Sequence, residues 1–182
     1  GFKIASSFLG SKLHEAKDPS LHLKKMFLQV SGSMLNCMIE YRDYWKEATS
    51  SKEIELLRVE IPYPKPEPIP VELNAQWEAF RDALEEGMNN HQLHTPQNIL
   101  EEVKRRNLGD EVWARLVYHL ASKYQSKPAE RATILSTLHA MWLGKIAYFI
   151  EETINLTDDE AEDKIKEEAE VFQDLRYLLN PP

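Results

Sequence analysis

Six histidines, a single cysteine and a few short basic runs are the residues of this sequence most able to bind metals or phosphates. His14 lies between Lys12 and Lys17 in a predicted polar turn, and its residue type alone predicts an exposed turn histidine. His91 and His94 are three residues apart, but turn-forming neighbours favour a loop with two solvated histidines over a metal site. The sequence has no glycine-rich phosphate loop, paired-cysteine metal motif or nucleophile motif, so we assign no catalytic residue.

Composition limits the kinds of partner. Cys37 has no second cysteine to pair with, which suits a reducing compartment, and its place among apolar residues predicts a small buried side chain. The formal net charge of −8 disfavours nonspecific binding to nucleic acid. No apolar run approaches the roughly 20 residues of a membrane span. We therefore expect a cytoplasmic protein with no transmembrane segment and no nucleic-acid partner.

The run KLHEAKDP at residues 12–19, with Met26, Gln29 and Val30 after it, carries a family resemblance. It resembles the C-terminal end of the catalytic domain of family two glycosyltransferases, which have the GT-A fold. It is similar to the segment that closes this domain in glucosyl-3-phosphoglycerate synthases and related bacterial transferases.

The resemblance implies that His14 is a ligand of a divalent metal, Mg²⁺ or Mn²⁺, and that Lys12 and Lys17 lie beside the diphosphate of a nucleotide sugar. An Asp-x-Asp motif upstream of this chain would supply the other protein ligands. The chain would then be the C-terminal fragment of a hexosyltransferase acting on a small or lipid-linked acceptor. Alone it would be inactive and hold no cofactor, because the catalytic domain that binds the nucleotide sugar lies mostly outside it.

Two functions of other classes stay open. The helices after residue 71 could form a protein-interaction or dimerisation module, with a homodimer built from leftover apolar surface. A bundle that binds a small molecule is a further alternative, although the sequence shows no polar constellation that supports it. Sedimentation or light scattering tests the module, because a clean monomer at high concentration counts against self-association.

The elements that position these residues are predicted to be helices. We expect an all-α bundle of five or six helices, with a short N-terminal extended segment and a proline-rich strap. Residues 1–48 would end the catalytic domain, residues 49–71 would be the linker, and residues 72–182 would form the helical C-terminal domain. The alternating prolines from Pro62 to Pro70 predict an extended linker.

Helix boundaries and apolar faces follow from spacing. Asp18-Pro19 predicts the start of the first helix, and Gly32 within it predicts close packing. Thr157 and Glu160 form a predicted capping box. The helix opened by Pro128 has a wide apolar face and should lie at the centre of the bundle. The predicted apolar stripe of the first helix is Leu23, Phe27, Val30, Met34, Cys37, Tyr41 and Trp45.

Overall fold

The computed structural model describes residues 5–7, 19–47, 55–57, 72–90 and 92–179, with the backbone alone described for 5–7, 19–22 and 55–57. The helices in these ranges are α1 (Pro19–Glu40), α2 (Arg42–Trp45), α3 (Leu73–Asn89), α4 (Gln97–Lys104), α5 (Asp110–Ser126), α6 (Arg131–Thr153) and α7 (Asp158–Asp174). A short 3-10 turn at Pro128–Glu130 lies between α5 and α6, and another at Leu175–Leu179 follows α7. Six helices have eight or more residues and α2 is a single turn, so the predicted all-α bundle is confirmed.

Two short strands accompany the helices. Strand β1 (Ala5–Ser7) pairs in parallel with β2 (Glu55–Leu57), with Ala5 opposite Glu55. Strand β1 falls within the predicted N-terminal extended segment. The proline-rich residues 58–71 lie outside the part of the chain that the structure describes.

Local signals in the sequence set several helix ends. Helix α1 begins at Pro19, as predicted. The capping box of α7 is also formed, since the Glu160 N–H donates to Thr157 Oγ1 at 3.3 Å and the Thr157 N–H donates to Glu160 Oε2 at 2.8 Å. Both bonds satisfy amides that the first helical turn would otherwise leave unpaired.

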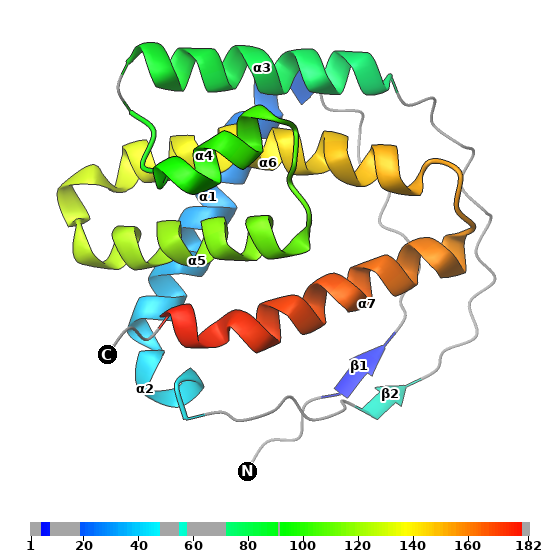
Figure 1. The fold of residues 1–182 in the computed structure, drawn as a ribbon. Coiled ribbons are helices and arrows are strands. Elements are labelled where there is room, and N and C mark those ends of the chain that lie inside the picture. Colours follow the sequence, from blue (N-terminus) through cyan, green and yellow to red (C-terminus); the bar gives the residue numbers. More distant parts are fainter. Residues whose placement is uncertain (1–4, 8–18, 48–54, 58–71, 91, 180–182) are drawn as a thin grey trace.

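Helix α6 lies at the centre of the bundle, as its wide apolar face predicts. Figure 1 shows α3 above α6, α5 below it and α7 beyond α5, with α1 crossing behind them. The largest side chains with almost no exposed surface are Val103, Leu108, Leu116, Leu120, Ile134 and Met141. Helices α4, α5 and α6 and the turn before α5 contribute these residues, so one core serves the whole bundle.

Helix α1 packs on this core with a different face from the one predicted. Leu35 is buried in the core, with Phe27 and Met38 packed against it. A Cβ atom on Gly32 would lie 3.2 Å from Leu135 Cδ1, which confirms the predicted close packing.

The predicted stripe is wrong in its centre, because Val30, Met34, Cys37 and Tyr41 are exposed. The prediction of a buried Cys37 is therefore wrong as well. Two apolar faces compete on α1, and periodicity alone does not show which of them meets the core.

Gly144 allows α6 to approach α3. A Cβ atom there would lie 2.7 Å from two atoms of the Phe80 ring and 2.9 Å from Leu108 Cδ1. Both neighbours are buried, so neither can move away without disturbing the core.

Gly144→Ala should lower the free energy of unfolding by about 1–2 kcal/mol, measured by urea denaturation. The overpacking cost exceeds the helix-propensity gain of at most about 1 kcal/mol. Gly32→Ala is the matched control, because its closest neighbour is the mobile end of a leucine side chain, and we expect it to change stability little. A Gly144→Ala variant as stable as the parent would contradict this packing.

Lys145 ties three helices together from inside the bundle. Its side chain is 7% exposed, and its Nζ lies 2.9 Å from Asp110 Oδ1 at the start of α5 and 2.9 Å from Glu168 Oε2 on α7. The two carboxylates are themselves largely covered, at 28% and 20% exposed. Because the ammonium is buried and both carboxylates are mostly covered, water stabilises these charges only weakly and they stabilise one another.

Lys145→Met should lower the free energy of unfolding by about 2–4 kcal/mol, because it leaves two mostly buried carboxylates without their cation. The triple variant Lys145→Met/Asp110→Asn/Glu168→Gln should recover much of this loss, since it removes the charges together. Chemical denaturation of the parent and both variants measures the effect. A triple variant no more stable than Lys145→Met would show that the ion pairs are not the cause.

Candidate functional site

The residues that the sequence assigns to a metal and diphosphate site lie outside the described part of the chain. These are Lys12, His14 and Lys17, and His91 is outside it too. Among the described residues, no group of three or more His, Cys, Asp or Glu side chains could hold a metal ion. His94 is only 20% exposed, and its Nδ1 lies 3.4 Å from Glu130 Oε2. His94 lies in a loop, as expected, but the prediction that it is solvated is wrong.

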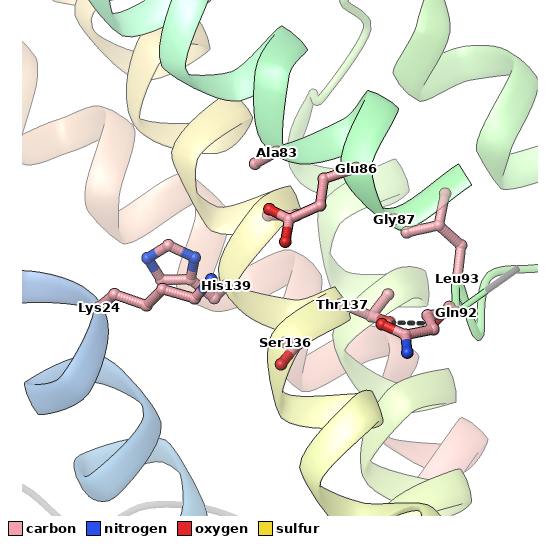
Figure 2. Close-up of a pocket in the computed structure, with 10 residues that line it drawn as sticks. Lys24, Ala83, Glu86, Gly87, Gln92, Leu93, Ser136, Thr137 and His139 are labelled. Atoms are coloured by element: carbon pink, nitrogen blue, oxygen red, sulfur yellow. Dashed lines mark hydrogen bonds between the residues drawn. The ribbon is translucent and has the colours of Figure 1, made fainter. Parts of the chain in front are cut away.

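A polar hollow of about 80 Å³ lies where α1, α3, α6 and the loop after α3 meet. Figure 2 shows Lys24 entering from α1, Glu86 pointing from α3 towards α6, and His139 beside Lys24. The remaining lining residues are Ala83, Gly87, Gln92, Leu93, Ser136, Thr137 and Ala140. The polar hollow thus combines one cation, one carboxylate and one imidazole from three separate helices.

Thr137 holds the loop after α3 against α6 and so shapes one wall of the polar hollow. Its hydroxyl donates to the Gln92 carbonyl at 2.9 Å, with the Thr133 carbonyl at 3.0 Å, and it accepts from the His94 N–H at 3.5 Å. Gly87 lets this loop turn back closely, because a Cβ atom there would lie 2.6 Å from Leu93 Cδ2. The wall is therefore built from backbone and hydroxyl groups that already satisfy one another.

His139 is the buried ionisable group of the polar hollow. It is 8% exposed, and its ring packs edge-on against Phe27 with ring centroids 5.3 Å apart. Burial lowers the pKa of His139, and the nearby Lys24 ammonium lowers it further. The imidazole is therefore neutral at pH 7, with one nitrogen able to donate a hydrogen bond and the other able to accept one.

The chemistry of the polar hollow suits binding more than catalysis. Its volume is enough for several water molecules or one small polar group. Lys24 and Glu86 both line the polar hollow, so it presents one positive and one negative side chain to a small polar ligand. Sequence reasoning missed this site, because its side chains come from three segments that are more than forty residues apart and follow no local motif.

Comparisons with protein-family models, with curated proteins and with solved structures find no match to this chain. No helix in the described ranges combines the length and the apolar character that crossing a bilayer requires. The functional assignment therefore depends on the residues of the chain itself.

An NMR titration should show the His139 imidazole protonating below the ordinary histidine value of about 6.5, because the folded state disfavours its charged form. At pH values between the His139 pKa of the folded protein and about 6.5, the unfolded chain therefore binds more protons than the folded protein. Acid should therefore favour unfolding, with the His139 contribution to stability complete above about pH 6.5 and lost as the pH falls below it.

His139→Gln should assign the resonance and remove this part of the stability loss between neutral pH and about pH 5.5. Lys24→Gln should raise the His139 pKa only partway, because burial remains the larger cause. A titration midpoint at or above the ordinary value would contradict the burial of this imidazole.

Proposed function

We propose that this chain is the C-terminal part of a cytoplasmic, metal-dependent glycosyltransferase that transfers a hexose from a nucleotide sugar to a small or lipid-linked acceptor. The observation that carries the proposal is the run from Lys12 to Pro19 together with the Met26 to Val30 pattern. In the family it resembles, such a run closes the catalytic domain and leads into a helix. Consistent with this, α1 begins at Pro19 and continues without a break through Val30.

In the proposed enzyme His14 binds the divalent metal, and Lys12 and Lys17 lie beside the diphosphate. An imidazole between two lysines suits such a site, because it adds no negative charge where the phosphates already supply it. The metal would neutralise the charge that grows on the departing nucleoside diphosphate. The described helices offer no cluster of further metal ligands, so those would come from residues outside them.

The bundle itself is proposed to be an accessory domain of this enzyme. Most of its apolar residues after the linker pack in or against its own core. The polar hollow lies near the N-terminal end of α1, since Lys24 is in the second turn of that helix. It is therefore near the end of α1 that follows the proposed site residues Lys12, His14 and Lys17 in the sequence.

The test is sugar transfer by the full-length protein that contains this chain, assayed with several labelled nucleotide hexoses in the presence of Mg²⁺ or Mn²⁺. His14→Ala should lower transfer at least about tenfold and raise the metal concentration needed for half-maximal activity. His91→Ala is the matched control, because the resemblance gives that histidine no role. Equal activity and equal metal dependence of His14→Ala and the parent would exclude the ligand role.

A further inference from the structure

The polar hollow has a buried floor and a charged rim. Thr137, His139 and Ala140 line it and are buried, so they form the floor. Lys24 on α1 and Glu86 on α3 also line it and are exposed, so they form the rim. A small molecule that enters therefore meets hydrogen-bonding groups at the floor and two opposite charges at the rim.

The two rim charges come from different walls of the polar hollow. Figure 2 shows the Lys24 side chain reaching in from α1 and the Glu86 carboxylate pointing from α3 towards α6. Among the lining residues, no hydrogen bond joins Lys24 to Glu86, and none reaches the His139 ring (Figure 2). The polar hollow of about 80 Å³ lies where their helices meet, so one ligand can contact both charges at once.

We propose that the polar hollow binds a small amino acid as its zwitterion. The Lys24 ammonium would hold the ligand's carboxylate, and the Glu86 carboxylate would hold its ammonium group. The structure thereby supplies the polar constellation that the sequence alone did not show. The inference uses only described residues of the bundle and does not rest on the proposed function.

The neutral ring of His139 suits a zwitterion. It can accept a hydrogen bond from the ligand's ammonium group or donate one to its carboxylate, and it adds no charge of its own. Because the ring packs against Phe27 and is buried, its position is fixed before the ligand arrives. A charged imidazole beside Lys24 would instead favour a plain anion.

Ligands with a single charge fit the polar hollow less well. A carboxylate alone gains the contact with Lys24, but it brings a negative charge towards Glu86 and into a chain whose formal net charge is −8. An amine alone gains the contact with Glu86, but Lys24 repels it. A zwitterion meets an opposite charge on each side and has no net charge, so it avoids both costs.

The volume of the polar hollow limits the size of the amino acid. One water molecule needs about 10–15 Å³ of such a cavity, so 80 Å³ accommodates a ligand of roughly five to eight non-hydrogen atoms. Glycine, alanine and serine are of this size, whereas tryptophan is too large. Because the rim charges are exposed, each contact is weak, and we expect a dissociation constant on the order of 1 mM.

The test is an NMR titration of the 182-residue chain with L-alanine at neutral pH. The binding curve is followed through the ring resonance of His139 and the amide resonances of Gln92, Leu93 and Ala140, which line the polar hollow. We expect saturable shifts, with acetate and methylamine each binding at least about threefold more weakly than alanine. Tryptophan at the same concentrations should leave these resonances in place.

Lys24→Gln and Glu86→Gln should each weaken alanine binding at least about threefold, since each removes one of the two charges. Lys25→Gln and Glu85→Gln are the matched controls, because they remove the same charges at neighbouring exposed positions that do not line the polar hollow. The controls should bind alanine as tightly as the parent does. All four positions are exposed, so the variants should stay folded, which circular dichroism checks.

Three results would overturn the assignment. Acetate binding as tight as alanine binding, weakened by Lys24→Gln and unchanged by Glu86→Gln, would identify an anion site. Alanine binding equal in the parent and both of these variants would place the ligand elsewhere on the chain. No saturable shift with glycine, alanine or serine, at concentrations well above the expected dissociation constant, would show that the polar hollow holds water alone.

Discussion

The buried ion pairs of Lys145 constrain how the helices of this protein can be arranged. The ammonium lies in the centre of α6, and its two carboxylates come from the first residue of α5 and from the middle of α7. Apolar packing alone permits helices to slide along or rotate about one another at modest cost. A covered charge does not, because a shift of a few ångströms separates it from its partners in a medium of low dielectric constant. The ion pairs of Lys145 therefore help to fix the position of α7 relative to α5 and α6, and side-chain packing around them contributes the rest.

Close packing at Gly144 and Gly32 fixes the other two neighbours of α6. The Phe80 ring occupies the space above Gly144, and Leu135 on α6 and Tyr124 on α5 approach Gly32 from the core side. These contacts bring α3 and α1 to α6 at a separation that leaves the polar hollow between them. The same arrangement buries His139 and keeps it neutral at pH 7. The site is thus a consequence of where three helices meet, and no single segment encodes it.

The helices and their ends are predicted well from the sequence. Which face of a helix packs on the core is predicted less well. Pro19, the Thr157 capping box and the wide apolar face of α6 are local signals, so helix ends and the central helix were predictable. Lys145 is the one lysine, arginine, aspartate or glutamate in the mostly apolar segment 132–150, which was a readable signal of a buried ion pair and was missed. The polar hollow had no such signal. On α1, Val30, Met34 and Cys37 match a helical period as well as Leu35 and Met38 do, and only the packed core separates the two faces.

Helix α1 has a buried apolar face and an exposed apolar face. A helix that packs on one side needs one apolar stripe, and its opposite side ordinarily gains stability and solubility from charge. Helix α1 has two apolar stripes and no charge between Lys25 and Glu40, and only one of the stripes packs on the core. The core of the bundle meets one of them through Leu35 and its neighbours. The other face, which includes Val30 and Met34, is exposed.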